Sequence, residues 1–324
     1  DGTFTDWTEG QGFAYGTQRA GRGVSPLDYD FDGDVDIFVS NYRLNANWFY
    51  QNDGDGTFND VAWLNGLAGY EANGYYGHTI GSVWGDFDND GDFDMLQSNL
   101  AHPRFYHFSD RTLLMLNNGS GVFENYAEAA GLHYRETHSN PTVADFDLDG
   151  SWDLFITATY NGRFSEMYLN NGDATFEQVN YESGAIIHNG WGSAASDFDQ
   201  DGDVDLVASN LYRNDGAAFG SWLQVRTLGG ETGFGTVNAA GIGAIVKVTA
   251  SDLELLSHTA GGSGTGCQDS QFLTFGLGAE TTVDQIDVYY PGGTSVTVDG
   301  PIVANQRVWI QADGTVTYGW APPM

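Results

Sequence analysis

The sequence has very few cysteines, lysines and long apolar runs. Cys267 is the only cysteine, so the chain can form no internal disulfide and no cysteine-rich zinc site. A single cysteine fits a secreted protein as well as a cytosolic one, and does not decide the compartment. Lys247 is the only lysine, so Schiff-base or P-loop chemistry would need that residue, and we expect neither. No apolar run reaches the roughly 18 residues that a membrane-spanning helix needs.

Positive charge is also scarce. The chain has 11 Lys+Arg against 44 Asp+Glu, which gives a formal net charge of -33. This excludes a nucleic-acid binder that relies on phosphate neutralisation, and it argues against docking on anionic lipid. The hydrophobic fraction of 41% is sufficient for a folded core, and 45 glycines against 7 prolines indicate many tight turns. With 324 residues, the chain is long enough for two or three domains, and the composition is typical of all-β proteins.

Two short blocks repeat through the first two thirds of the chain. An acidic block of nine residues occurs at 28–36, 86–94, 145–153 and 197–205, with starts 58, 59 and 52 residues apart. A second block, a turn followed by Phe, occurs at 1–4, 52–58, 117–123, 170–176 and 214–219. Each repeat has room for about four short strands, and a four-strand unit at this period is typical of a β-propeller blade. We therefore predict an all-β propeller over residues 1–220, with a single helical turn near Tyr126–Ala130.

The acidic blocks stop at about Ser221, and Gly/Thr/Val-rich, strand-like runs follow. Several of these runs alternate apolar and polar residues, which predicts a second β-rich module over residues 221–324. Five Phe blocks accompany four acidic blocks, so the chain starts and ends partway through a repeat. Either strands from both ends seal the ring, or the C-terminal module packs on the propeller or completes it. The sequence leaves these alternatives open.

The acidic block has the pattern of a calcium loop. Carboxylates at positions 1, 3, 5 and 9 would repel one another when bare, and a hard cation with six to eight oxygen ligands removes that conflict. Gly at position 6 supplies the sharp turn, and position 7 is expected to offer its main-chain carbonyl. The segment that follows is β-like, so the block is not an EF-hand. We predict about four Ca2+ ions. The predicted metal-site residues are Asp28, Asp30, Asp32, Asp34, Asp36, Asp86, Asp88, Asp90, Asp92, Asp94, Asp145, Asp147, Asp149, Ser151, Asp153, Asp197, Asp199, Asp201, Asp203 and Asp205.

These patterns resemble two known families. The Asp-x-Asp-x-Asp-Gly-x-x-Asp loops between Phe/Gly turns resemble the FG-GAP/VCBS repeats of integrin-α-type propellers. The runs Trp222–Val225, Gly241–Ala244, Phe275–Gly278 and Tyr290–Gly293 resemble the ASPIC/UnbV domain that often follows such repeats. The resemblance implies an extracellular calcium-binding propeller that takes part in binding or adhesion, and it implies no substrate.

Other residues offer weaker signals. His78, His138 and His188 lie seven to nine residues before three of the acidic blocks. They either line the propeller axis and bind a transition metal or pack inside the blades, and the alternation of strand side chains favours packing. The insert that holds His102, Arg104 and His107 is either a surface recognition loop or a solvated one. The stretch 261–266 is Gly-rich but lacks the helix and Lys of a phosphate site, and is predicted to be a turn.

The functional prediction is a secreted, calcium-binding module without enzymatic activity. Its expected partner is an extracellular protein or glycan, with no nucleic acid. One alternative is a structural subunit of an extracellular filament or matrix that self-associates by β-strand pairing, with the block at Phe4 as a donated strand. Another is a carbohydrate-active enzyme or its accessory module. The chain begins at Asp1 without Met, which indicates that a leader was removed or that the chain was trimmed.

Overall fold

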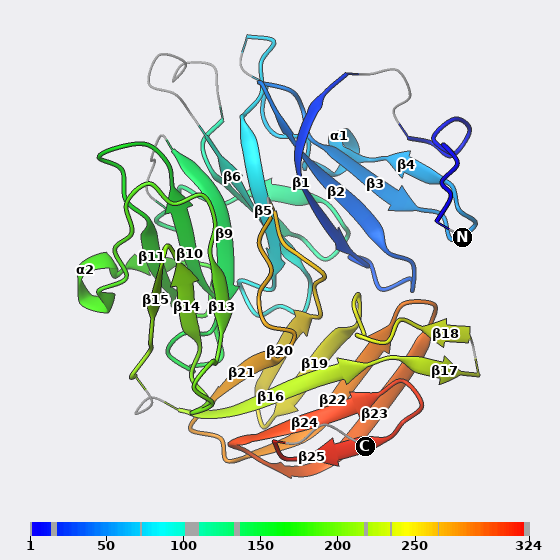
Figure 1. The fold of residues 1–324 in the computed structure, drawn as a ribbon, viewed down its shortest axis with the longest axis vertical. Helices are drawn as coiled ribbons and strands as arrows, with labels where there is room; N and C mark the ends of the chain where they lie inside the picture. Colours follow the sequence, from blue (N-terminus) through cyan, green and yellow to red (C-terminus); the bar gives the residue numbers. More distant parts are fainter. Residues whose placement is uncertain are drawn as a thin grey trace.

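The computed structural model describes residues 2–13, 18–71, 73–100, 110–132, 137–216, 220–233, 235–264 and 266–320. Strands dominate, which confirms the prediction of an all-β fold. The repeats form a row of twisted sheets in the upper part of Figure 1, and the C-terminal module lies beneath them. Residues 101–109, which include the candidate recognition loop with His102, Arg104 and His107, lie outside these ranges.

Each of the first three repeats forms a four-stranded antiparallel sheet, here called a blade, with its strands in chain order. Blade 1 comprises β1 (Ala20–Leu27), β2 (Asp36–Tyr42), β3 (Trp48–Asn52) and β4 (Phe58–Asp60). Blade 2 comprises β5 (Thr79–Gly85), β6 (Asp94–Asn99), β7 (Leu113–Asn117) and β8 (Phe123–Asn125). Blade 3 comprises β9 (His138–Ala144), β10 (Asp153–Ala158), β11 (Glu166–Asn170) and β12 (Phe176–Gln178). The acidic blocks are the loops that join the first and second strand of each blade.

The fourth repeat forms a shorter blade. In the described part of the chain, blade 4 has three strands, β13 (Ala194–Ser196), β14 (Asp205–Ala208) and β15 (Asn210–Tyr212). The first strands of the blades pack in a row, with β1 against β5, β5 against β9 and β9 against β13. Blades 1 and 4 are therefore the two ends of the row. This arrangement is that of a propeller whose repeats are arrayed around an axis formed by their first strands.

Helix is a minor component, as predicted. Two helices of one turn, α1 (Ala62–Asn65) and α2 (Asn180–Ser183), follow the outermost strands of blades 1 and 3. At the same place in blade 2, the predicted turn at Tyr126–Ala130 is closed by a hydrogen bond from the Ala130 amide to the Tyr126 carbonyl (2.8 Å).

The C-terminal module consists of two four-stranded sheets and one hairpin. One sheet has the order β21-β16-β24-β25, the other β20-β19-β22-β23, and β17 pairs with β18. The order differs from that of a blade because β16 and β24 pair in parallel. The module therefore packs on the repeats and does not supply further blades of the same kind. Its strands are β16 (Ser221–Leu228), β17 (Gly230–Thr232), β18 (Gly235–Val237), β19 (Ile245–Ala250), β20 (Leu253–His258), β21 (Leu273–Gly278), β22 (Thr282–Tyr290), β23 (Thr294–Val303), β24 (Gln306–Gln311) and β25 (Val316–Tyr318).

The connection between β20 and β21, of which residues 259–264 and 266–272 are described, leaves the C-terminal module and runs between the first strands of the blades (Figure 1). We call it the axial loop. The space around Gly264 is so narrow that a Cβ there would overlap Asn140 Oδ1 of β9 and lie 2.9 Å from the Gly81 Cα of β5. Ala195 of β13 donates its amide to Asp269 Oδ1 (2.8 Å) and accepts the amide of Ser270 (2.9 Å). The described residues of the Gly-rich stretch 261–266 are thus part of a tightly packed axis.

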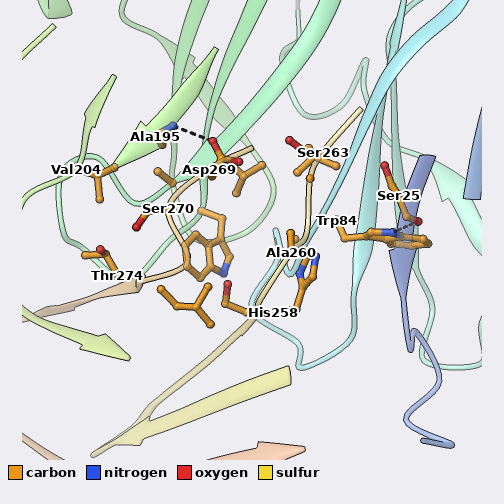
Figure 2. A pocket seen from close by; sticks show the side chains of 18 of the residues that line it. Ser25, Trp84, Ala195, Val204, His258, Ala260, Ser263, Asp269, Ser270 and Thr274 are labelled. Atoms are coloured by element: carbon orange, nitrogen blue, oxygen red, sulfur yellow. Dashed lines mark hydrogen bonds between the residues drawn. The ribbon is translucent and has the colours of Figure 1, made fainter. Parts of the chain in front are cut away.

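A small cavity borders the axial loop. Figure 2 shows Asp269 bonded to Ala195 on one side of it, Trp84 beside Ser25 on the other, and His258 between them. Its volume of about 90 Å³ is far below the roughly 300 Å³ or more of a small-molecule site, and equals about three water molecules at roughly 30 Å³ each. Burial raises the pKa of Asp269 to about 7 and lowers the pKa of His258 to about 4. We conclude that the cavity is a small packing defect at the axis, below the size of a substrate pocket.

Two glycines of the axial loop allow its packing to be tested. Both Gly264 (φ +50°) and Gly266 (φ +71°) have a left-handed backbone, but a Cβ at Gly266 would meet no atom within 4 Å. Gly266→Ala is therefore expected to cost only the conformational penalty of about 1–2 kcal/mol. Gly264→Ala adds a clash at the axis and is expected to destabilise the protein by about 2–5 kcal/mol in total. Thermal unfolding of both variants measures the difference, and equal melting temperatures would show that the axial loop is not packed as described.

Candidate metal centres

The four acidic loops share one backbone conformation. Gly at position 6 is left-handed in every loop, as the sequence predicted, with φ values of 95° at Gly33, 92° at Gly91, 99° at Gly150 and 107° at Gly202. Position 4 is left-handed as well, although its residues are not glycines; they are Phe31, Asn89, Leu148 and Gln200. This conformation was not predicted, because only Asn among these residue types favours it. The two left-handed positions curl each loop so that its carboxylates face one another.

The carboxylate at position 9 fastens both ends of the loop. In the third loop, Asp153 accepts the Phe146 amide at Oδ2 (2.8 Å) and the Asn170 amide at Oδ1 (2.8 Å). Asp36, Asp94 and Asp205 bind the amides of position 2 and of the corresponding Asn in the same way. Position 9 therefore ties the start of the loop to the end of the third strand.

The Asn partners of position 9 were missed by the sequence analysis. Each also donates its side-chain amide to the carbonyl of position 8, and Asn170 donates in addition to the Phe87 carbonyl of the preceding blade (2.8 Å). Their recurrence as the first residue of every internal Phe block was the signal that could have identified them. They are Asn52, Asn117, Asn170 and Asn214.

The carboxylate at position 1 lies under the loop. Gly33 donates its amide to Asp28 Oδ2 (3.0 Å), and the second and third loops repeat this bond. Burial, followed by the neighbouring carboxylates, raises the pKa of Asp28 to about 6, of Asp86 to about 7 and of Asp145 to about 8. Without a cation, the charged form of these groups is therefore less favourable than it is for a carboxylate in water.

The donor atoms fit a calcium ion. In each loop, oxygens of three carboxylates lie within 4.8 Å of one another, which is the span between ligands at about 2.4 Å from a shared Ca2+. They come from positions 1, 3 and 5 in the first two loops and from positions 1, 3 and 9 in the last two. Asp28 Oδ1, Asp88 Oδ1 and Asp147 Oδ1 are buried without a hydrogen-bond partner among the described residues. Buried, unpartnered carboxylate oxygens that face a cluster of oxygens suit a hard cation.

The exposure of the side chain at position 7 differs from loop to loop. The sequence predicted a main-chain ligand there, with a free side chain. Asp34 and Asp92 are partly exposed, whereas Ser151 and Asp203 are buried. Both carboxylate oxygens of Asp203 lack a hydrogen-bond partner in the described part of the chain. Burial, and then the adjoining Asp201, raise the pKa of Asp203 to about 7, so the fourth loop carries a further carboxylate that could serve as a ligand.

The loops also touch the C-terminal module, which the sequence did not indicate. Gly292 donates its amide to the Gly33 carbonyl of the first loop (2.9 Å). The ring of Phe93 in the second loop packs edge-on against His258, with centroids 5.5 Å apart. In the third loop, Asp145 Oδ2 accepts the Gly276 amide (3.0 Å). Each of these three loops therefore joins a blade to the module.

The fourth loop makes the most polar contact with the module. Asp197 Oδ2 accepts the side-chain amide of Gln224 (2.7 Å) and lies 3.5 Å from the Arg307 guanidinium. Arg307 donates in turn to Gln224 Oε1 (2.6 Å). Gly202 lies directly under the indole of Trp222, where a Cβ would overlap the ring. A residue from the module thus already places positive charge beside the fourth cluster.

The histidines named in the sequence analysis do not form a metal site in the described ranges, where every candidate metal group consists of aspartates. His138 is buried and hydrogen-bonds Glu166 Oε2 at Nε2 (3.0 Å) and Thr112 Oγ1 at Nδ1 (2.7 Å). His78 and His188 lie against aromatic rings. These contacts correspond to packing and hydrogen bonding inside the blades.

The fold and the loops define an all-β repeat protein with a series of acidic loops that could each hold a metal ion. A family model described as FG-GAP-like repeat matches residues 28–96 and 145–208, and one described as ASPIC and UnbV matches residues 235–317. The chain thus carries FG-GAP-like repeats followed by an ASPIC and UnbV domain. Both resemblances drawn from the sequence are confirmed.

Curated relatives carry the name cartilage acidic protein 1. The proteins from Xenopus tropicalis, Homo sapiens and Mus musculus are 27%, 28% and 27% identical to this chain and cover 86% of it. The matched part is 42%, 42% and 43% of their own length, so the chain spans less than half of these relatives.

Several solved structures are similar at a low level, each with a TM-score of 0.36. An Agrocybe aegerita lectin that recognises non-reducing terminal N-acetylglucosamine is 20% identical, over 62% of this chain and 51% of its own. The exotype rhamnogalacturonan lyase YesX is 13% identical, over 86% and 57%. The V. cholerae biofilm matrix protein Bap1 is 12% identical, over 97% and 62%. These values are too low to carry a functional argument.

Proposed function

We propose that this protein is a secreted binding or adhesion module whose repeats and C-terminal module are held together by about four bound calcium ions. The observation that carries the proposal is the buried, unpartnered carboxylate oxygen in loops that also contact the module, such as Asp28 Oδ1 and Asp147 Oδ1. A bound cation would neutralise the clustered carboxylates and draw them together. The same loops would then present a fixed surface to the C-terminal module.

Calcium suits the loops better than magnesium. The clusters offer several protein carboxylates each, whereas Mg2+ prefers few carboxylates and keeps much of its water. Extracellular calcium modules commonly bind with dissociation constants of about 0.1–1 mM, so millimolar calcium should load the loops. The name of the cartilage relatives also supports an extracellular role, and no helix in the described ranges is long and apolar enough to span a membrane.

The proposed role is binding and not catalysis. The chain keeps a strong acidic balance even with four calcium ions, from -33 to about -25, so cationic protein surfaces are favoured as ligands. Aromatic side chains such as Trp63, Trp191 and Tyr181 are exposed and can stack on sugar rings.

The test first measures the number of bound calcium ions per chain and then screens for a ligand. Equilibrium dialysis against radioactive calcium is expected to give about four ions per chain, with little competition from equimolar magnesium. A panel of glycans and extracellular matrix proteins is then probed with the calcium-loaded protein and in EGTA. Less than one bound calcium would overturn the metal assignment, and turnover of a polysaccharide in the same panel would overturn the non-catalytic role.

A further inference from the structure

The fourth acidic loop differs from the other three in its cationic neighbours. Arg307 Nη2 of the C-terminal module lies 3.5 Å from Asp197 Oδ2, the carboxylate at position 1. Arg213 Nη1, just after β15, lies 3.7 Å from Asp199 Oδ2, the carboxylate at position 3. Within the described ranges, no further ion pair reaches an acidic loop. Positive charge is scarce in this chain, so its placement at one loop of four sets that loop apart.

The two guanidiniums change the charge of the fourth loop. The first, second and fourth loops each have five aspartates, and the third has four because Ser151 stands at position 7. With every carboxylate ionised, two positive charges leave the fourth loop at -3, against -5 for the first and second loops and -4 for the third. The attraction for a divalent cation is therefore expected to be weakest at the fourth loop.

The other loops meet the module through uncharged groups. Backbone amides of the module, from Gly292 and Gly276, donate to the first and third loops. The second loop contacts the ring of His258, and burial lowers the pKa of this histidine to about 4, so the ring is neutral at physiological pH. Among these contacts with the module, only that of the fourth loop includes a cationic side chain.

The carboxylate at position 1 is also held differently in the fourth loop. Asp86 of the second loop accepts the amides of positions 5 and 6 (3.1 Å each), so its hydrogen bonds stay inside the loop. Asp197 Oδ1 accepts the Gln200 amide (2.7 Å), but Asp197 Oδ2 accepts the side-chain amide of Gln224 from the module (2.7 Å). One oxygen of this carboxylate is therefore bonded to the module, next to Arg307.

Arg307 is fixed in position by its surroundings. Its Cζ lies 4.3 and 4.2 Å from the ring centroids of Phe272 and Trp320, and its Nε donates to Gln224 Oε1 (2.6 Å). β16 and β24 run side by side in Figure 1, and their parallel pairing places Gln224 opposite Arg307. The side chain of Arg307 is only 8% exposed. A guanidinium keeps its charge in proteins, so a permanent positive charge lies at the fourth loop.

Arg213 is a weaker neighbour of the same loop. Its side chain is 57% exposed, and its shorter ion pair is with Asp215, which lies outside the loop (2.5 Å). Ion pairs between exposed side chains contribute little, because water and salt screen them. Arg213 therefore serves as a matched control, with the same charge at the same loop but without the burial of Arg307.

The fourth loop still has the donor atoms of a metal site. Oxygens of Asp197, Asp199 and Asp205 lie within 4.8 Å of one another. Both carboxylate oxygens of Asp203 are buried and have no hydrogen-bond partner in the described part of the chain. The loop is therefore expected to bind a cation in the presence of Arg307, but with a lower affinity.

We propose that Arg307 is a built-in counter-ion that makes the fourth loop bind calcium about tenfold more weakly than the other three loops. The inference rests on the proposed calcium function of the loops. The guanidinium neutralises part of the charge of Asp197, and it repels a divalent cation that shares this carboxylate. A tenfold difference places the fourth loop near a dissociation constant of about 1 mM and the others near about 0.1 mM, within the range of extracellular calcium modules.

The fourth loop would then respond to calcium at concentrations that already fill the other three. Its occupancy changes the charge at the contact between blade 4 and the C-terminal module. Because Gln224 and Arg307 hold Asp197 without a metal, this contact persists when the fourth loop holds no calcium. The junction between blade 4 and the module is therefore the part of the protein whose charge is set by millimolar calcium.

Calcium titration of the full chain tests the order of filling. Isothermal titration calorimetry of the parent is expected to show three ions bound at about 0.1 mM and a fourth at about 1 mM. Asp199→Asn removes the charge at position 3 of the fourth loop and should abolish only the weak component. Asp88→Asn makes the same change in the second loop and should abolish one of the three tight components.

Variants of the two arginines test the cause. Arg307→Met removes the charge but keeps a long side chain between the two rings, and is expected to raise the affinity of the fourth loop about tenfold. Arg307→Lys retains the charge, so the weak component should remain. Arg213→Met removes a charge from the exposed side of the same loop and is expected to change the affinity less than about twofold.

The results separate this inference from the proposed function. A chain that binds no calcium at any loop overturns both. Four ions bound by the parent with equal affinity, or the loss of a tight component in Asp199→Asn, overturn the inference and leave the calcium function in place. The same conclusion follows if Arg307→Met and Arg307→Lys bind the fourth ion alike. The first two outcomes need no Arg307 variant, so they hold even if such a variant does not fold.

Discussion

Removing calcium is expected to lower the melting temperature by about 8–16 °C, the largest change that we predict for any single treatment. At about 10 mM calcium, sites with dissociation constants of about 0.1–1 mM contribute about 1.4–2.7 kcal/mol each, hence about 6–11 kcal/mol for four. A chain of this length unfolds with an entropy of about 0.7 kcal/mol/K, which converts that free energy into the stated shift.

The measurement is a pair of thermal melts, in 10 mM calcium and in excess EGTA. A third melt in EGTA with 10 mM magnesium controls for ionic strength, and is expected to follow the calcium-free curve because the clusters favour a larger ion with more carboxylate ligands. Because every loop also touches the C-terminal module, the loss should involve both parts of the chain in one transition. Coincident melts in calcium and EGTA would refute the calcium assignment.

Much of the repeat region followed from the sequence because its signals are local. The glycine at position 6, such as Gly33 and Gly202, is dictated by the turn of the loop itself. The period of the acidic blocks and the short strand runs between them sufficed to predict four-stranded units. The candidate metal groups that the structure brings together, such as Asp28 with Asp30 and Asp32, are all among the predicted residues.

What the sequence could not supply are contacts between distant segments. The axial loop was predicted as a simple turn, because only the assembled blades show that Gly264 is pressed against Gly81 and Asn140. The same holds for Arg307, which lies near Asp197 although 110 residues separate them. Such contacts depend on how the sheets pack, and no local sequence pattern around Gly264 or Arg307 indicates them.

The structure also separates two roles within one loop that the sequence treated alike. In the third loop, Asp153 at position 9 holds two backbone amides, while Asp147 Oδ1 at position 3 has no hydrogen-bond partner among the described residues. Both belong to the same candidate metal group with Asp145. Asp153 thus holds the backbone of the loop in addition to being a potential metal ligand, whereas Asp147 is suited to the cation alone.

Replacing Asp153 is therefore expected to be costly with or without calcium. Asp153→Ala leaves the buried amides of Phe146 and Asn170 without acceptors, at about 1–3 kcal/mol each, and also removes a ligand when calcium is present. Ser151→Ala is the matched control at position 7. Its backbone amide still donates to Asp149 Oδ1, so the change should stay within about 0.5 kcal/mol.

Asp147→Asn should separate the metal from the scaffold. The variant keeps the shape of the side chain but removes the negative charge of Asp147. In the parent, burial and then the neighbouring Asp149 carboxylate raise the pKa of Asp147. In EGTA it is expected to melt at or slightly above the parent temperature, because a repulsion is relieved. In 10 mM calcium it should melt below the parent, having lost about 1.4–2.7 kcal/mol from one site. Calcium titrations of the three variants, followed by melting temperature, decide the matter. If Asp147→Asn behaves like Asp153→Ala in EGTA, or Ser151→Ala is the most damaging of the three, the division of roles within the loop is wrong.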